Sequence, residues 1–253
     1  IVYGDILDAN CLEQALAGVD YLFHLAGIIS ISNGKEQLVH SVNVDGTRMI
    51  MMAAQAANLK RVIYTSSIHA FKRISHGTTI DENTPIDPAS SIAAYDQSKA
   101  EATLMVLEMS KQGLPVVIAC PTGVIGPYDF KKSELGELFN DWITHKVNVL
   151  IEGSYDFVDV RDVAEGLILA REKGKIGQLY ILSGQLIRVS DLWKLVKELV
   201  SYKAYFFNIP LPLAKISAFF ADIYYRLFRK KPKFTSYSIE TLQSNAVISN
   251  IKA

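Results

Sequence analysis

The chain has 253 residues, enough for one large α/β domain or a domain with a smaller partner, and its composition, 49% hydrophobic and 21% charged, is that of a folded globular protein. Its 26 basic and 26 acidic residues give a formal net charge of zero, which predicts neither a nucleic-acid partner nor general attraction to an anionic membrane. Two cysteines, Cys11 and Cys120, are too few and too far apart for a disulfide framework or a zinc site. We therefore expect a reduced, cytoplasmic protein without a bound metal.

The first half of the chain alternates between short apolar runs, typical of buried strands, and longer segments with helical spacing. The predicted elements are strand Tyr21–Leu25, helix Val39–Ala57, strand Arg61–Tyr64, helix Ala93–Gln112 and strand Pro115–Ala119. Asn58 and Gly113 are suited to end the two helices. His24, which has no second histidine or carboxylate at ligand spacing, is interpreted as a packed core residue. This order predicts an α/β fold, a doubly wound parallel sheet with right-handed crossovers.

The second half is less regular. Residues 128–156 are more polar and are predicted to be irregular, apart from one helix at Glu134–Thr144. The chain then returns to the sheet, with a helix at Asp159–Arg171 and a strand at Gln178–Leu182. An amphipathic helix follows at Ser190–Tyr202, with Ser190 as its expected N-cap.

The segment Leu211–Phe228 is strongly apolar and aromatic and precedes the basic run Arg229-Lys230-Lys231. Such a pattern can anchor a protein to a membrane. A spanning helix, however, needs about 20 nearly uncharged residues, and Lys215, Asp222 and Arg226 interrupt this segment. We expect a helix packed on the second domain and no membrane contact.

One predicted helix carries Tyr95 and Lys99, four residues apart and therefore on the same face. An ammonium beside a phenol favours the phenolate, so this pair is suited to exchange a proton near neutral pH. The spacing alone describes a solvated lysine beside a half-buried tyrosine equally well. A site is favoured by the polar residues at the strand ends, where ligands of open parallel sheets bind; they are Ala26-Gly27, Ser66-Ser67 and Pro121-Thr122-Gly123.

Together these segments resemble the extended short-chain dehydrogenases/reductases, the NAD-dependent epimerase/dehydratase family. The matching segments are Gly4-Asp5-Ile6 with Asp8, Val19–Gly27, Asn43–Thr47, Val62–Ser67, Tyr95–Glu101, Pro121–Pro127 and Phe157–Ala164. The resemblance implies a Rossmann dinucleotide-binding domain, residues 1–124 and 157–182, with NAD or NADP as cofactor. Residues 125–156 and 183–253 would form a smaller C-terminal substrate-binding domain.

The resemblance also implies roles for single residues. Tyr95 would be the catalytic acid/base, Lys99 would bind the nicotinamide ribose and lower the tyrosine pKa, and Ser67 would hydrogen-bond the reacting substrate oxygen. Asp5 and Ile6 would meet the adenine ring, and Asn43 would have a structural role beneath the site. The remaining residues implied to line the cofactor are Leu25, Ala26, Gly27, Pro121 and Val124. Hydride passes directly between the nicotinamide and an oxygen-bearing carbon, so the protein must supply orientation and a proton, and no metal.

Two departures from the family pattern matter. The Gly-rich phosphate loop, and the residue that separates NAD from NADP, would precede Ile1, so we expect residues upstream of this sequence. Many relatives have Arg before the proline at 121, where this chain has Cys120, and sugar-nucleotide epimerases often have Asn near Gly123. These differences favour the branch resembling dihydroflavonol reductases and hydroxysteroid dehydrogenases.

Three functions remain open. The first is an NAD(P)-dependent oxidoreductase that acts on a secondary alcohol or ketone. The second is a nucleotide-sugar epimerase or dehydratase, which would use the same residues and regenerate its own cofactor. The third is a non-catalytic NAD(P)-binding regulator, which would have no use for Ser67, Tyr95 and Lys99 together. The resemblance further implies a homodimer formed through helices Val39–Ala57 and Ala93–Gln112, with a small-molecule substrate.

Overall fold

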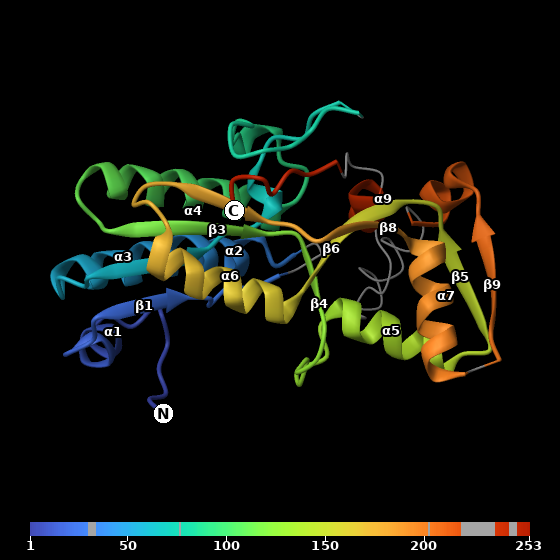
Figure 1. Cartoon of the computed structure of the whole chain (residues 1–253), viewed down its shortest axis with the longest axis horizontal. Coiled ribbons are helices and arrows are strands. Elements are labelled where there is room, and N and C mark those ends of the chain that lie inside the picture. Colours follow the sequence, from blue (N-terminus) through green and yellow to red (C-terminus); the bar gives the residue numbers. More distant parts are fainter. Residues whose placement is uncertain (30–33, 76, 202, 219–235, 243–246) are drawn as a thin grey trace.

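The computed structural model describes residues 1–29, 34–75, 77–201, 203–218, 236–242 and 247–253. Its centre is a four-stranded sheet in which every pairing is parallel (Figure 1). In spatial order the strands are β1 (Tyr21–His24), β2 (Arg61–Thr65), β3 (Val116–Pro121) and β7 (Leu179–Leu182). They lie where the apolar runs predict them, so the α/β class with a parallel sheet is confirmed.

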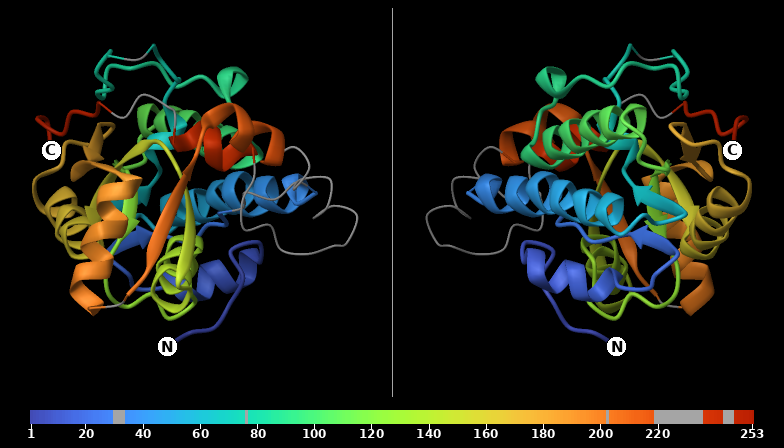
Figure 2. Two further views of the ribbon diagram at one scale, coloured as in Figure 1. Left: turned by 90° about the vertical axis from the view of Figure 1, so that its right-hand side faces the viewer. Right: turned by 90° about the vertical axis from the view of Figure 1, so that its left-hand side faces the viewer.

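Helices cover both faces of this sheet, which explains why its strands are apolar along their length (Figure 2). One face packs against α1 (Ala9–Leu16), α3 (Thr47–Ala56) and α4 (Ala94–Lys111), and the other against α6 (Val160–Lys173). Alternate residues of β2 pack against the helices on opposite faces of the sheet, because successive side chains of a strand point to opposite sides. Val62 and Tyr64 pack with the first set of helices, and Ile63 packs with α6.

The predicted helix Val39–Ala57 begins earlier than expected and is irregular in its middle. It comprises α2 (Glu36–His40), a π-helical turn over Ser41–Gly46, and α3. Asn58 follows with a φ of 52°, which ends the helix as predicted. Beneath it His24 is buried, with Nε2 at 2.9 Å from the hydroxyl of Thr47, so its interpretation as a packed core residue is confirmed.

The second half of the chain contains more strands than the sequence predicts. A second sheet has the order β4 (Gly123–Ile125), β6 (Ser154–Asp159) and β8 (Gln185–Arg188), with β4 and β6 parallel and β6 and β8 antiparallel. A two-stranded parallel sheet pairs β5 (Val147–Ile151) with β9 (Tyr205–Ile209). Figure 1 shows these sheets, with α5 (Glu134–Thr144) and α7 (Val189–Val200), to the right of the central sheet.

The prediction of an irregular segment over residues 128–156 is therefore wrong outside α5. A hydrophobicity pattern does not predict β5, because its valines are exposed and the polar residue between them is buried. Val147 and Val149 are exposed, whereas Asn148 between them is buried. The amide of Asn148 is satisfied by the backbone oxygens of Trp142 and His145, at 3.4 and 3.1 Å.

The predicted N-cap of the next helix is also wrong. Ser190 lies inside α7, and the residue before the helix is Arg188, whose side chain makes no capping hydrogen bond. Tertiary contacts decide the start, because Val189 is buried beside Trp193 and its N–H donates to the backbone oxygen of Gly153 at 3.1 Å. The helix ends at Val200, and Tyr202, the predicted last residue, lies outside the described residues.

Residues 211–218 are helical, as the prediction for Leu211–Phe228 requires, and residues 219–228 lie outside the described residues. The side chains of Ala214 and Ala218 share a buried cluster with Ile151 and with Ile239 of α9 (Ser236–Leu242). Within the ranges that the structure describes, no helix combines the length and the apolar character that a membrane crossing requires.

Candidate active site

The two serines that follow β2 have different contacts. The hydroxyl of Ser66 hydrogen-bonds that of Thr103, which joins the end of β2 to α4. Ser67 caps a 3-10 turn, Ile68–Ala70, where its hydroxyl accepts the N–H of His69 at 3.2 Å. Ser67 also lies close enough to the side chain of Tyr95 to oppose the rise in its pKa. Of the predicted pair, Ser67 is the residue that reaches the candidate catalytic tyrosine.

Tyr95 and Lys99 lie one helical turn apart on α4, and both are buried, with 7% and 8% of their surface exposed. The ammonium of Lys99 donates a hydrogen bond to the backbone oxygen of Thr65, the last residue of β2, at 3.0 Å. It also lies 5.5 Å from the ring centre of Tyr64. The carboxyl end of β2 and the first turns of α4 thus meet at one site.

Burial dominates the protonation of both groups. It raises the pKa of Tyr95 to about 12, although the nearby side chain of Ser67 acts in the opposite direction. It lowers the pKa of Lys99 to about 8. The expected lowering of the tyrosine pKa by Lys99 is not found, and Tyr95 is a neutral phenol at neutral pH. In this state it is a proton donor.

Asn43 connects the loop after β1 to α4. It lies in the π-helical turn, where its side-chain oxygen accepts the N–H of Ile28 at 2.8 Å. Its amide nitrogen donates to the backbone oxygen of Ile28 at 2.9 Å and to the hydroxyl of Ser98 at 3.0 Å. The hydroxyl of Ser98 in turn donates to the backbone oxygen of Tyr95. Asn43 therefore supports the helix that carries Tyr95 and Lys99.

Gly27 borders the same space. A Cβ atom at this position would lie 3.3 Å from the side-chain oxygen of Asn43 and 3.6 Å from the ammonium of Lys99. A side chain here would extend over the ammonium. The structure thus brings Gly27 and Lys99, both predicted to contact the cofactor, to one place.

The other predicted cofactor residues are distributed around this point. Asp5 is exposed and accepts the N–H of Leu7, and Ile6 packs over Gly46 of the π-helical turn. Leu25 and Ala26 are exposed after β1. Pro121 is buried at the end of β3, and Val124 is half-buried in β4. A cofactor contact for each of these residues stays a prediction.

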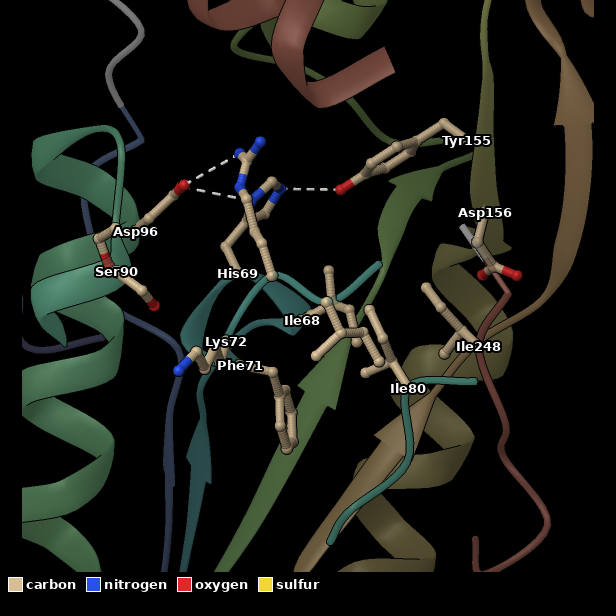
Figure 3. A pocket seen from close by; sticks show the side chains of 13 residues that line it. Ile68, His69, Phe71, Lys72, Ile80, Ser90, Asp96, Tyr155, Asp156 and Ile248 are labelled. Atoms are coloured by element: carbon tan, nitrogen blue, oxygen red, sulfur yellow. Dashed lines mark hydrogen bonds and ion pairs between the residues drawn. The ribbon is translucent and has the colours of Figure 1, made fainter. Parts of the chain in front are cut away.

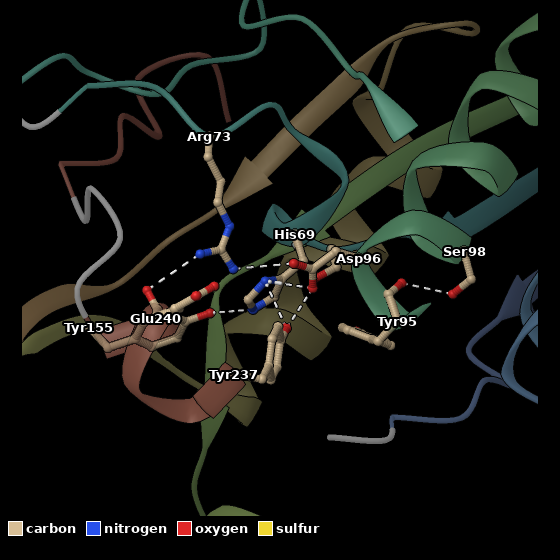
Figure 4. Close-up of polar contacts among 9 residues, drawn as sticks. His69, Arg73, Tyr95, Asp96, Ser98, Tyr155, Tyr237 and Glu240 are labelled. Carbon is tan, nitrogen blue, oxygen red and sulfur yellow. Dashed lines mark hydrogen bonds and ion pairs between the residues drawn. The ribbon is translucent and has the colours of Figure 1, made fainter. Parts of the chain in front are cut away.

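A polar cluster beside Tyr95, with a buried carboxylate at its centre and half-buried partners around it, was not predicted. It consists of His69, Arg73, Asp96, Tyr155 and Tyr237, which come from distant parts of the chain (Figure 4). The available sequence signals were only the positions of Asp96, directly after Tyr95, and of His69, two residues after Ser67.

The cluster borders a pocket with two kinds of wall (Figure 3). Its polar wall includes His69, Arg73, Asp96 and Tyr155, and its apolar wall includes Ile68, Phe71, Ile80 and Ile248. Lys72, Ser90, Ser91 and Asp156 also line the pocket, and its enclosed volume of about 40 Å³ is far below that of a substrate pocket.

The doubly wound parallel sheet, with a serine, a tyrosine and a lysine at its carboxyl edge, defines a Rossmann-type enzyme that acts with a nicotinamide dinucleotide. Residues 1–182 match the model of the NAD dependent epimerase/dehydratase family, and the chain belongs to this family. The predicted family and its NAD or NADP cofactor are confirmed.

Individual relatives support the same assignment. The sterol demethylase protein B of Methylococcus capsulatus is 33% identical over 244 residues, which are 96% of this chain and 74% of that protein. The putative dihydroflavonol 4-reductase of Synechocystis is 34% identical over 76% of this chain, which spans only 57% of that reductase. The crystal structure of gox2253 is 32% identical, with a TM-score of 0.84 over all of this chain and 77% of that one.

The residues present fit the nicotinamide ribose side of the cofactor. Lys99 and Tyr95 supply an ammonium and a phenol that can hydrogen-bond ribose hydroxyls, and Gly27 leaves the space beside the ammonium open. The lowered pKa of Lys99 shows that its charge is poorly solvated by the protein alone. Polar hydroxyls placed beside it would compensate for that burial.

Proposed function

We propose that the protein is an NAD(P)-dependent oxidoreductase that transfers a hydride between the nicotinamide and a secondary alcohol or ketone of a mainly apolar, ring-containing substrate. The observation that carries this proposal is the convergence of Ser67, Tyr95 and Lys99 at the carboxyl edge of the sheet. The names of two relatives, a sterol demethylase protein B and a putative dihydroflavonol 4-reductase, support the substrate class.

Each side chain has a defined task in this reaction. The bound cofactor supplies or accepts the hydride. In the reductive direction, the phenol of Tyr95 donates its proton to the oxygen that becomes a hydroxyl. The hydroxyl of Ser67 stabilises the negative charge that develops on this oxygen. Lys99 binds the ribose hydroxyls and places its positive charge near the tyrosine when the phenol is deprotonated.

Two other functions predict different cofactor behaviour. A nucleotide-sugar epimerase or dehydratase would use the same three residues but would show no net change in NAD(P)H. A non-catalytic regulator would bind the cofactor without turnover. The buried placement of Tyr95 and Lys99 favours catalysis over regulation, because burying an ammonium lowers stability and needs a functional reason.

The division into two domains is part of the proposal. Residues 1–124 and 157–182 would form the dinucleotide-binding domain, and 125–156 and 183–253 the substrate domain. Separate hydrophobic clusters support this division. Val163 and Leu167 of α6 pack with the central sheet, whereas Trp142 and Trp193 belong to a separate cluster of the second part; Phe157, at the boundary, packs with this second cluster.

The proposal includes a homodimer in a cytoplasmic setting. Leu38, Met52 and Leu104 are exposed apolar residues on α2, α3 and α4, the helices expected to pair across a dimer axis. Both cysteines are free thiols, which suits a reducing compartment. Sedimentation that finds only monomers at micromolar concentration would contradict the dimer.

The test follows NAD(P)H absorbance with the full-length protein. The substrates are 5α-cholestan-3β-ol with NAD⁺ or NADP⁺, the corresponding 3-ketone with NADH or NADPH, dihydroquercetin with NADPH, and UDP-glucose. We expect turnover of a ring alcohol or ketone with stoichiometric change in NAD(P)H. Conversion of UDP-glucose without net NAD(P)H change would support the epimerase instead.

Tyr95→Phe separates catalysis from binding. The variant is expected to lose about 10²–10⁴-fold in turnover while it keeps nearly wild-type affinity for NAD(P)H. Tyr180→Phe is the matched control, since the Tyr180 hydroxyl only accepts the N–H of Lys175. Unchanged turnover in Tyr95→Phe would remove the catalytic assignment.

A further inference from the structure

The proposed reaction does not use the polar cluster beside Tyr95, although the cluster joins several parts of the fold. Its members are His69 from the turn after β2, Arg73 from the following loop, Asp96 from α4, Tyr155 from β6 and Tyr237 from α9. We call these five residues the Asp96 cluster. Figure 4 shows them converging on one carboxylate and one imidazole.

The carboxylate of Asp96 is the centre of the cluster, with a side chain that is only 3% exposed. One oxygen accepts a hydrogen bond from the hydroxyl of Tyr237 and lies 3.3 Å from Nδ1 of His69. The other accepts from the guanidinium of Arg73 at 3.2 Å. Burial opposes ionisation, but the contacts with His69, Tyr237 and Arg73 outweigh it and lower the pKa of Asp96. Asp96 is therefore an ionised, fully engaged carboxylate.

This carboxylate fixes the imidazole of His69 from one side, and Tyr155 fixes it from the other. The hydroxyl of Tyr155 lies 2.8 Å from Nε2 of His69. Both ring nitrogens therefore have partners, and these partners come from α4 and from β6. The ring has no freedom to rotate without breaking one of the two contacts.

His69 in turn contacts both residues that handle the substrate oxygen. Its ring packs edge-on against the ring of Tyr95, with centroids 5.8 Å apart. Its backbone N–H donates to the hydroxyl of Ser67 at 3.2 Å. A shift of His69 would therefore move the phenol and the serine hydroxyl relative to each other.

We propose that Asp96 is a positioning residue for the reaction of Tyr95. By fixing His69 it sets the relative orientation of Tyr95 and Ser67, and by binding Tyr237 it makes this orientation depend on the docking of α9. The proposal rests on the proposed function and deepens it.

The docking of α9 has support beyond Tyr237. The guanidinium of Arg73 donates to the backbone oxygen of Glu240 at 3.4 Å. Ile239 is buried in the cluster with Ile151 and Ala214. A Cβ atom at Gly153 would lie 2.6 Å from the backbone oxygen of Leu242, so α9 packs closely against the second part of the chain. The substrate side of the site is thereby linked to the catalytic helix.

The first test measures steady-state kinetics of the full-length protein with 5α-cholestan-3-one, or whichever ring ketone the preceding screen identifies, and NADPH or NADH. Asp96→Asn and His69→Gln are expected to lower kcat about 10–100-fold, because a misplaced catalytic group costs this much. Their affinity for NAD(P)H should change less than about twofold, since neither residue is placed at the cofactor. Tyr237→Phe should lower kcat by less than about tenfold, as one hydrogen bond is lost.

Two control variants make the same chemical changes elsewhere. Asp191→Asn removes the charge of an exposed carboxylate paired with Lys194 on α7. Tyr180→Phe removes a hydroxyl of β7. Both should retain wild-type kcat and KM.

The second test is the pH dependence of kcat. It should be the same in wild type and variant if Asp96 only stabilises the fold. The negative charge of Asp96 raises the pKa of Tyr95, so in Asp96→Asn the loss of activity that follows deprotonation of Tyr95 should move to lower pH, whereas the loss that follows deprotonation of Lys99 near pH 8 should not. The other titratable or charged groups that face Tyr95 and Asp96 are unchanged in the variant; they are His69, Arg73, Tyr155, Tyr237, Lys99 and Tyr64.

Wild-type kcat and pH profile in Asp96→Asn and His69→Gln would overturn the proposal. A fall in kcat that follows a fall in Tm, with no shift in the loss of activity that follows deprotonation of Tyr95, would also overturn it, because the cluster would then serve stability alone. If the wild type turns over no alcohol or ketone, the proposed function fails, and this proposal fails with it.

Discussion

The ammonium of Lys99 lies 3.0 Å from the backbone oxygen of Thr65, so this side chain connects α4 to the end of β2. This contact is made at a cost, because the ammonium is almost completely removed from water. Burial lowers the pKa of Lys99 from 10.5 to about 8. The lysine proposed to bind the nucleotide therefore destabilises the protein when no nucleotide is added.

Lys99→Met is expected to stabilise the protein at pH 7 without added nucleotide. The gap between a pKa of 10.5 and one of about 8 corresponds to about 3 kcal/mol. The net gain should be smaller, about 1–2 kcal/mol, because the Thr65 oxygen loses its donor. Urea denaturation monitored by far-UV circular dichroism measures it. Lys60→Met, at an exposed lysine paired with Asp20, is the control and should change little.

The pH dependence of stability gives a second check on Lys99. Between about pH 8 and 10.5 the unfolded chain binds more protons at this lysine than the folded chain does. The contribution of Lys99 to the free energy of unfolding therefore rises with pH across this window. The difference between wild type and Lys99→Met should shrink over the same range. A difference that stays constant would show that the folded pKa is not lowered.

Ser67→Ala is expected to lower kcat by about 10²–10³-fold, because the substrate oxygen loses a hydrogen-bond donor where charge develops. Ser67→Thr retains a hydroxyl and should recover most of this loss. Ser66→Ala is the matched control, since Ser66 hydrogen-bonds Thr103. Ser66→Ala should lower the free energy of unfolding, and its effect on kcat should be much smaller than that of Ser67→Ala. Equal kinetic losses in Ser66→Ala and Ser67→Ala would argue against a distinct role for Ser67.

Asn43→Ala should destabilise the protein by about 1–3 kcal/mol, because the buried backbone groups of Ile28 lose their partners. NAD(P)H affinity should also fall, since the loop after β1 is no longer attached to α4 through Ser98. Asn140→Ala, at an exposed position of α5, provides the comparison and should leave both quantities unchanged. Chemical denaturation and fluorescence titration with NADH distinguish the two effects. A stable variant with normal affinity would mean that Asn43 is dispensable.

Gly27→Val is expected to weaken NAD(P)H binding by at least about tenfold, since its methyl groups would extend toward the ammonium of Lys99. Gly27→Ala should have a smaller effect, because its Cβ atom lies 3.3 Å from the Asn43 oxygen and needs only a small displacement. Thermal melting without nucleotide should show little change in either variant. Normal affinity in Gly27→Val would place the cofactor elsewhere.

The central sheet was predictable because its strands are buried on both faces and read as continuous apolar runs. β3 is an example, since every residue from Val116 to Pro121 is buried. β5 was missed because Val147 and Val149 face outward while Asn148 is buried. A polar residue can be buried when backbone oxygens satisfy its amide, and local sequence gives no sign of those oxygens.

The candidate site was predictable to the extent that its residues are neighbours in the chain. Tyr95 and Lys99 are separated by one helical turn, and this distance can be counted along the sequence. Tyr155 and Tyr237 cannot be found in this way, because they reach His69 and Asp96 only through the packing of β6 and α9. The protonation of Tyr95 was not predictable for a similar reason, as it depends on how deeply the folded protein buries the ring.

The π-helical turn at Ser41–Gly46 also determines where Asn43 points. A π-helical turn spans more residues than an α-helical one, so this stretch holds a residue that a regular helix would have no room for. Deleting one residue here would allow an unbroken α-helix whose two flanks keep nearly their present orientation, because the π-helical turn already accommodates the extra residue. The residues of the turn itself would be displaced, and with them the amide of Asn43 that contacts Ile28 and Ser98. Chain length at this point, as much as residue identity, is thus a condition for a working site, and homologous sequences that lack the extra residue would need another way to hold the loop after β1.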